Sequence, residues 1–150
     1  MKFATNNKKI NEIKSDCLMV SVFDDGKLRG ATKLVNTSNG KLIEDFIKNK
    51  DIQGKIGQTR IIPVRGKSYK RIVLVGCGTF ENFSQKNYRK AVISALKKIS
   101  LSNHKKVVSL IHDGVENINS PNKAYRMARV LAESWNAISY QYTKIGRAHV

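Results

Sequence analysis

Cys77 and its two neighbouring glycines are the first residues whose types and spacing could do chemistry. They form Gly76-Cys77-Gly78 directly after the apolar run Ile72–Val75. Two glycines after a buried strand are typical of a loop that holds the phosphates of a dinucleotide. The full fingerprint needs a third glycine where this chain has Glu81, and no acidic residue follows at the expected distance. We therefore interpret both glycines as a tight exit from a buried strand.

Cys77 could also be a nucleophile, with His112 and Asp113 as its base and orienting carboxylate, because these residues also follow an apolar run. Nothing in the sequence places the three in contact. A buried, reduced thiol is the commoner role, and we expect it for Cys77 and for Cys17. Two such cysteines without a disulfide fit a cytoplasmic protein. The histidines are scattered, at His104, His112 and His149.

Three acidic residues are weaker candidates. Asp24 and Asp25 are adjacent, but neighbouring carboxylates need not converge on one site, and either could cap the helix that follows. Glu133 lies beside Trp135 in a helical segment, where we expect a surface or helix-packing role. No His, Cys, Asp and Glu cluster has metal-ligand spacing. We therefore predict no catalytic, metal-binding or cofactor-binding residue in this chain, and we assign no residue to nucleic acid.

The charge of the chain is strongly positive. It has 28 Lys and Arg against 11 Asp and Glu, a formal net charge of +17. Such a field attracts nucleic acid and other polyanions. The positive residues are nevertheless spread along the chain and do not form one basic arm, so a solvated basic surface is the favoured interpretation. Nucleic-acid binding stays as the alternative.

Strand-like and helix-like segments alternate along the chain. We expect strands at Lys2–Thr5, Cys17–Phe23, Gln58–Val64, Arg71–Gly76 and Lys106–His112. The run Arg71–Gly76 is apolar without alternation, which predicts a central strand covered on both faces. Only Arg65-Gly66-Lys67-Ser68 separates it from the preceding strand. Because this link is too short for a helical crossover, the two strands should form an antiparallel hairpin.

Four helical segments should cover this mixed sheet. The inner positions of the first two are Leu28, Ala31, Leu34 and Val35, then Leu42, Ile43, Phe46 and Ile47. Ser84 should cap the third. Its inner face is Tyr88, Val92, Ala95, Leu96 and Ile99, and its outer face is Lys86, Arg89, Lys90, Lys97 and Lys98. Ser120-Pro121 should begin the last helix. Its inner face is Ala124, Met127, Ala128, Leu131, Trp135, Ile138 and Tyr142. The pattern predicts a three-layer α/β/α domain.

The two ends of the chain carry further expectations. The N-terminus lacks the apolar core of a signal peptide, and no apolar run is long enough to span a bilayer, which predicts a cytoplasmic protein without membrane contact. The segment Ile145–Val150 matches one translated frame of a common sequencing adapter. We therefore expect a domain at residues 1–144 and a non-native tail at 145–150, and we expect the natural protein to continue beyond this fragment.

Several segments together resemble the N-terminal domain of the leucyl (cytosol) aminopeptidase family. They are Gly54-Lys55-Ile56-Gly57-Gln58-Thr59, the run Arg71–Gly78, the helix from Asn87-Tyr88-Arg89-Lys90-Ala91, and the closing helix Ala128–Glu133 that ends near Tyr140-Gln141-Tyr142. The resemblance covers nearly all of residues 1–144. It implies a macro-domain-like α/β/α fold with a mixed sheet.

The resemblance also implies where the chemistry lies. The family's two divalent metal ions (zinc, manganese or magnesium) are held in a separate C-terminal catalytic domain that is absent here, so no catalytic or metal residue carries over to this chain. Full-length members form cytoplasmic homo-hexamers that release N-terminal residues, often leucine, from peptides. We expect this fragment to be inactive alone. The alternatives are a DNA-binding accessory domain, as in some bacterial members, and a macro-type nucleotide or ADP-ribose module with the loop after Gly76-Cys77-Gly78 near the phosphates.

Overall fold

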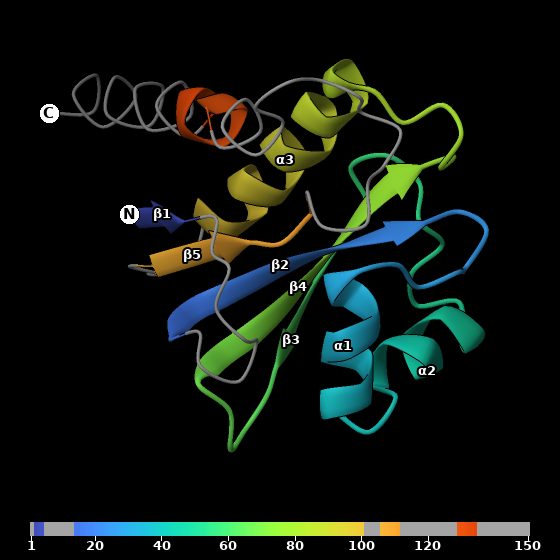
Figure 1. Cartoon of the computed structure of the whole chain (residues 1–150), viewed down its shortest axis with the longest axis vertical. Coiled ribbons are helices and arrows are strands. Elements are labelled where there is room, and N and C mark those ends of the chain that lie inside the picture. The colour runs from blue at the N-terminus through green and yellow to red at the C-terminus, as the bar shows by residue number, and fades with distance from the viewer. Residues whose placement is uncertain (1, 5–13, 101–105, 112–128, 135–150) are drawn as a thin grey trace, which may run out of the picture.

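The computed structural model describes residues 2–4, 14–100, 106–111 and 129–134 (Figure 1). The elements in chain order are β1 (Lys2–Ala4), β2 (Ser15–Phe23), α1 (Ala31–Ser38), α2 (Leu42–Lys48), β3 (Thr59–Pro63), β4 (Tyr69–Gly78), α3 (Gln85–Ser100) and β5 (Lys106–Ser109). Residues 129–134 are helical as well. The rest of the expected last helix, at 120–128 and 135–142, lies outside the described residues.

The strands form one five-stranded sheet in the order β1-β5-β2-β4-β3. β1, β5, β2 and β4 run parallel, and only β3 is antiparallel to its neighbour β4. The predicted hairpin is confirmed, with Ile61 opposite Val73 and Ile62 opposite Ile72. The prediction of a central strand is also confirmed, because β4 lies between β2 and β3 and its residues from Ile72 to Gly78 are all buried.

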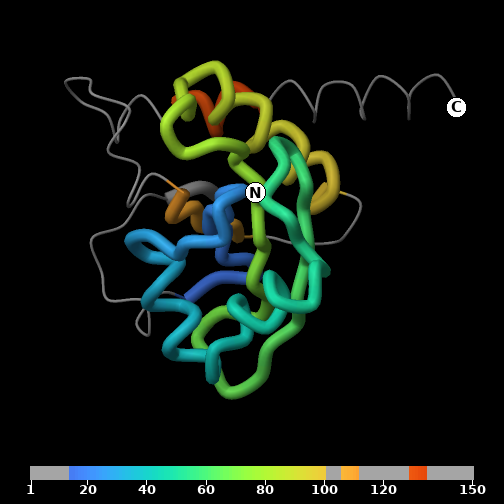
Figure 2. The backbone as a smooth tube through the Cα atoms, turned by 90° about the vertical axis from the view of Figure 1, so that its right-hand side faces the viewer, coloured from blue at the N-terminus to red at the C-terminus, as the bar shows by residue number. Residues whose placement is uncertain are grey.

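Helices cover both faces of the sheet, which confirms the three-layer prediction (Figures 1 and 2). On one face Val73, Val75 and Cys77 of β4 belong to the same buried cluster as α3 and residues 129–134. On the other face, Ile72 and Leu74 pack with α1 and α2. Because successive residues of a strand point to opposite faces, a strand between two helical layers must be apolar at every position.

α3 follows its predicted pattern closely. Its five predicted inner residues are all buried, and its five predicted basic residues are all exposed. Ser84 Oγ accepts a hydrogen bond from the Asn87 backbone N–H at 3.2 Å, which confirms the predicted cap.

α1 departs from its predicted pattern in three ways. Leu28 was expected on its inner face, but the helix begins only at Ala31. Leu34 is 58% exposed, whereas Ala31 and Val35 are buried, so the prediction that Leu34 faces the core was wrong. In a helix of only eight residues, the face toward the sheet is narrow and excludes Leu34. The predicted aspartate cap is also wrong. The N-cap of α1 is Gly30 and no side chain bonds to it, because the turn after β2 holds Asp24 and Asp25 away from the helix end.

Candidate functional site

The carboxyl ends of β2 and β4 are the place where this fold would bind a ligand. The two strands are parallel neighbours, but β2 leads to α1 on one face of the sheet and β4 leads to α3 on the other. In open α/β sheets, ligands bind in the crevice that forms where neighbouring connections diverge in this way. The candidate site therefore comprises the turn at residues 24–29 and the loop at 79–84.

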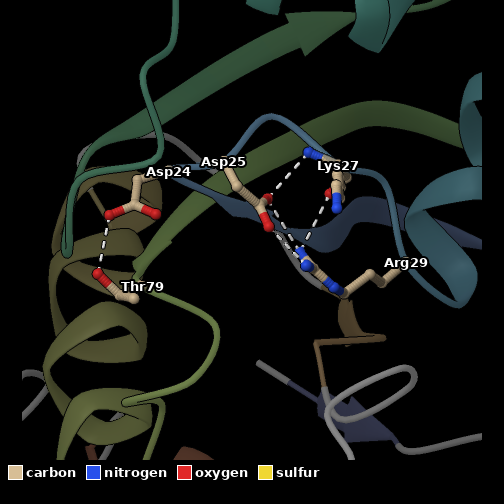
Figure 3. Close-up of polar contacts among 5 residues, drawn as sticks. All are labelled: Asp24, Asp25, Lys27, Arg29 and Thr79. Atoms are coloured by element: carbon tan, nitrogen blue, oxygen red, sulfur yellow. Dashed lines mark hydrogen bonds and ion pairs between the residues drawn. The ribbon is translucent and has the colours of Figure 1, made fainter.

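Asp24 ties the two strand exits together (Figure 3). Its backbone N–H donates to the Gly78 carbonyl at 2.9 Å, and its carboxylate oxygen Oδ2 accepts a hydrogen bond from Thr79 Oγ1 at 2.9 Å. These two contacts hold the end of β2 against the end of β4. They join segments that are 55 residues apart in the chain.

Asp25 has different partners (Figure 3). Its Oδ1 accepts the Lys27 N–H at 2.9 Å, and its two oxygens accept Arg29 Nη1 at 3.1 Å and Nη2 at 2.6 Å. The hydrogen bond from Arg29 lowers the pKa of the Asp25 carboxyl below its ordinary value of 3.8. As expected, the adjacent aspartates do not converge. A pair of carboxylates for acid–base chemistry does not form here.

The guanidinium of Arg29 covers the aromatic rings of the site. It lies 3.9 Å from the Phe80 ring centroid and 5.1 Å from that of Phe23. Phe23 in turn meets Phe80 and Phe83 edge to face, at 5.2 and 5.5 Å between centroids. A planar ligand that stacked on Phe80 would have to displace a cation held by two hydrogen bonds to Asp25.

The glycines after the central strand make room for a neighbouring loop. A Cβ on Gly76 would lie 2.0 Å from the Lys55 carbonyl oxygen. The Gly76 N–H donates to the Gln58 carbonyl, and the Gly78 N–H donates to that of Gly54, both at 2.7 Å. Gly78 also has φ +77, a conformation that favours glycine. These contacts confirm the interpretation of Gly76 and Gly78 as a tight strand exit.

The two cysteines are free and fully buried, as predicted. Burial raises the pKa of the Cys77 thiol to about 12 and that of Cys17 to about 11. The Cys77 Sγ lies 3.4 Å from the Val75 carbonyl oxygen, to which it donates. A thiol with so high a pKa is a poor nucleophile at neutral pH, because the thiolate is the reactive form. His112 and Asp113 lie outside the described residues.

Glu133 has the packing role that was expected of it. Its Oε1 accepts Arg129 Nε at 2.8 Å, and its Oε2 accepts Arg89 Nη2 of α3 at 3.2 Å. The hydrogen bond from Arg129 lowers the pKa of the Glu133 carboxyl most, and the hydrogen bond from Arg89 lowers it further. The carboxylate therefore joins the helical residues 129–134 to α3 on the protein surface.

The described parts of the chain offer neither a metal centre nor a membrane-spanning helix. No group of three or more His, Cys, Asp and Glu side chains there could hold a metal ion, so these residues do not fit a metal centre. None of the helices in those ranges is long and apolar enough to cross a membrane.

The outer face of α3 is a basic surface. The helix contains five basic residues and no acidic one. Arg89 pairs with Glu133, and Lys98 Nζ donates to the Thr59 carbonyl at 2.9 Å. Lys86, Lys90 and Lys97 form no ion pair with any residue that the structure describes. The helical period of the sequence predicted this basic face. It did not show which of the basic side chains bond to neighbouring residues.

Sequence reasoning missed the residues that close the candidate site. Arg29, Thr79 and Phe80 carried no motif, and the ring contact joins positions about fifty residues apart. The spacing of Asp25 and Arg29 weakly indicated an ion pair, because oppositely charged residues at i and i+4 often pair. In this chain, however, the pair closes a turn and does not lie on a helix.

Comparison with protein-family models gives one match. Residues 19–147 match the N-terminal domain of the cytosol aminopeptidase family. Curated relatives agree. The chain is 31% identical over 147 residues to a probable cytosol aminopeptidase of Buchnera aphidicola subsp. Schizaphis graminum, covering 97% of this chain and 28% of the relative. A probable cytosol aminopeptidase of Buchnera aphidicola subsp. Acyrthosiphon pisum (strain Tuc7) is 34% identical over 155 residues, covering 100% of this chain and 29% of the relative. The chain thus spans less than a third of the length of both.

Solved structures share the fold at low sequence identity. A tomato leucine aminopeptidase variant has a TM-score of 0.70 at 16% identity, covering 90% of this chain and 27% of that one. The macrodomain of Mycobacterium tuberculosis DarG also has a TM-score of 0.70, at 13% identity and with 91% of each chain covered. The macro-like architecture predicted from the sequence is therefore confirmed.

Proposed function

Because this chain belongs to the cytosol aminopeptidase family, as its N-terminal domain, we propose that it is the non-catalytic part of a longer, metal-dependent aminopeptidase. The observation that carries the proposal is the family match over residues 19–147. In this proposal, two divalent metal ions (zinc, manganese or magnesium) are held by a C-terminal domain outside this chain. The whole protein releases N-terminal amino acids from peptides and works as a cytoplasmic homo-hexamer.

The site geometry is consistent with a supporting role. The candidate site at the carboxyl edge is closed by the chain's own residues, with Arg29 over Phe80 and Asp24 bonded to Thr79. The described residues contain no metal-binding cluster. We therefore assign this chain no step of the hydrolysis.

Peptidase assays of the chain and of its longer gene product test the proposal. Purified 150-residue chain should release no p-nitroaniline from leucyl-p-nitroanilide, with or without added Mn²⁺. The product of the complete reading frame should hydrolyse the same substrate and lose activity with a chelator. Metal-dependent turnover by the 150-residue chain would contradict the assignment, as would a complete reading frame with no such activity.

We also propose that the native domain ends at residue 144 and that 145–150 is a tail of adapter origin. The family match runs to residue 147 and so overlaps the first three residues of this tail. Sequencing the gene past the codon for Lys144 decides the point. A natural reading frame that encodes Ile145-Gly146-Arg147-Ala148-His149-Val150 would overturn the tail assignment.

The macro-type alternative has less support than the peptidase assignment. A solved structure of similar fold is Thermosipho africanus DarTG in complex with ADP-ribose, with a TM-score of 0.61 at 14% identity. In this chain the aromatic rings at the ends of β2 and β4 are covered by Arg29. We therefore do not propose that a nucleotide binds at the ends of β2 and β4.

DNA binding is a second candidate because one observation favours it. Lys86, Lys90 and Lys97 follow one stripe of α3, exposed and without ion-pair partners among the described residues. A helix that presents only cations suits the phosphate backbone without reading sequence. The domain would then be a DNA-binding accessory to the peptidase, and its positive charge would attract the DNA.

A matched pair of triple variants tests DNA binding. The test replaces Lys86, Lys90 and Lys97 with alanine. The control replaces Lys48, Lys50 and Lys55, which removes the same charge from exposed positions outside α3. The α3 variant should bind duplex DNA more weakly and with a salt slope reduced by about 3, since each lost phosphate contact lowers the slope by about 1. Equal weakening by both variants, or no binding by the parent chain at low salt, would rule out an α3 interface.

A further inference from the structure

A hollow of about 660 Å³ lies between α1, α2 and the turn at residues 26–28. It is on the face of the sheet opposite α3, and α1 and α2 lie side by side there (Figure 1). Lys27, Lys33 and Lys41 are exposed residues in its lining, Leu28 adds apolar surface, and Asn36 and Glu44 complete the polar part. Its volume falls in the range of small-molecule sites, roughly 300–1,000 Å³.

Asn36 is a positioned hydrogen-bond donor in this hollow. The residue is only 5% exposed, and its Oδ1 accepts the backbone N–H of Glu44 at 3.0 Å. That bond orients the amide, because the oxygen must face the N–H. The Nδ2 group donates to no residue that the structure describes, although Asn36 lines the hollow. Asn36 therefore borders the hollow with its amide orientation fixed by the bond to Glu44.

The backbone around Asn36 is held firmly as well. Its carbonyl accepts the N–H of Asn39 at 3.2 Å and that of Lys41 at 2.9 Å. Lys41 has φ 63, the left-handed conformation that costs a non-glycine residue about 1–2 kcal/mol. These contacts fix the backbone of Lys41 at the rim of the hollow.

The charges around the hollow favour an anion. Three lysines line it against one carboxylate, that of Glu44, which leaves two positive charges in excess. The nearby carboxylate of Asp25 does not add to the opposing charge, because Arg29 neutralises it through two hydrogen bonds. The same carboxylate also accepts the Lys27 N–H and so fixes the backbone of that lysine (Figure 3).

We propose that this hollow binds a small molecule that carries a phosphate monoester. Lysine ammonium groups and an oriented amide N–H suit the several acceptor oxygens of such a dianion. The apolar surface of Leu28 and the aliphatic stems of the lysines would contact the organic part of the ligand. This site shares the turn at residues 26–28 with the candidate site at the ends of β2 and β4, but its other lining residues belong to α1, α2 and their connection. It is separate from the basic face of α3.

An NMR titration of the 150-residue chain with inorganic phosphate tests the proposal. The side-chain amide protons of Asn36 should shift and reach saturation at millimolar phosphate, at a constant ionic strength held with sodium chloride. Backbone signals of α3 should not follow the same curve. Absence of a saturable shift at Asn36 up to tens of millimolar phosphate would overturn the proposal.

Two substitutions test the site. Asn36→Asp keeps an oxygen for the Glu44 N–H, removes the donor and adds one negative charge. Lys41→Gly removes a charge from the hollow and relieves the backbone strain, so folding should be preserved. Each should weaken phosphate binding about tenfold or more, because hydrogen bonds to charged groups contribute about 1.5–3 kcal/mol.

The matched control is Lys50→Gly. Lys50 also has a left-handed backbone conformation, with φ 60, but it does not line the hollow. It should leave the affinity for phosphate within about twofold, since screening at constant salt reduces distant charge effects. Equal weakening by Lys41→Gly and Lys50→Gly would show that only net charge matters and would overturn the proposal.

Discussion

Neighbouring aspartates at the end of β2 differ in their effect on stability because their partners differ. Asp24 accepts from the neutral hydroxyl of Thr79, whereas Asp25 accepts two bonds from the Arg29 guanidinium. Hydrogen bonds in which both groups are charged are stronger, and here the Arg29 side chain is only 18% exposed. Arg29 also stacks on Phe80, so the ion pair fixes an aromatic contact between two loops.

Replacement of Asp25 by asparagine should lower the free energy of unfolding by about 1 kcal/mol at pH 7, the upper range for partly exposed ion pairs. The folded-state pKa of Asp25 is lowered, so its contribution is present above its ordinary pKa of 3.8 and is lost as the pH falls through the lowered value. Urea unfolding of the parent chain and Asp25→Asn should therefore differ at pH 7, and the difference should disappear as the pH falls through the lowered folded-state pKa of Asp25. The control Asp24→Asn, which keeps an acceptor for Thr79, should show a smaller loss at pH 7.

On the scale of elements, the central contact is that between β4 and the loop at residues 54–57. Backbone hydrogen bonds extend the β3–β4 pairing beyond Thr59, through Gln58 and Gly57 to Gly76. Gly54 then approaches the backbone of β2, where an added Cβ would lie 2.5 Å from the Phe23 carbonyl. The loop thus covers the ends of both strands, and only glycines allow backbone segments to approach so closely.

Gly76→Ala should therefore destabilise the fold by about 3 kcal/mol or more, because its Cβ would overlap a backbone oxygen that cannot rotate away. Gly66→Ala is the matched control. Gly66 has φ +73 with open space around it, so the cost there should be only the conformational one, about 1–2 kcal/mol. Thermal and urea unfolding of both variants measure the difference. Similar losses for the two would show that loop 54–57 is not packed against β4 as described.

On the scale of the whole molecule, the sheet joins two separate apolar clusters. Adjacent residues of β4 belong to different clusters, since Leu74 packs toward α1 and α2 and Val75 packs toward α3. Both side chains are fully buried. The two layers therefore share their central strands and should unfold together.

Leu74→Ala should cost about 2–5 kcal/mol, as is usual for a large core residue, and should leave one cooperative transition. During urea unfolding, methyl signals of Val35 in α1 and Val92 in α3 should disappear at the same urea concentration, although the substitution touches only the α1 and α2 side. Earlier loss of the Val35 signal would show that the α1 and α2 layer unfolds as an independent unit.

Several features of this protein were determined by its sequence alone. The nearly continuous apolar run at 17–23 and the apolar run at 72–75 predicted inner strands, because a strand buried on both faces is apolar at nearly every position. The short link at 65–68 required a hairpin, and Ser84 marked the start of α3 through a local capping bond. The family could also be recognised from the sequence. These features depend on neighbouring residues or on one repeating period.

Only the tertiary structure decided the strand order, the exposure of Leu34 and the closure of the candidate site. Arg29 meets Phe80, and Gly76 meets Lys55, only after strands far apart in sequence have paired. The orientation of the Asn36 amide is likewise set only when the Glu44 N–H bonds to its oxygen. Such roles depend on which surfaces the sheet brings together. Contacts across long sequence separations leave no local pattern, since each partner alone is an ordinary residue.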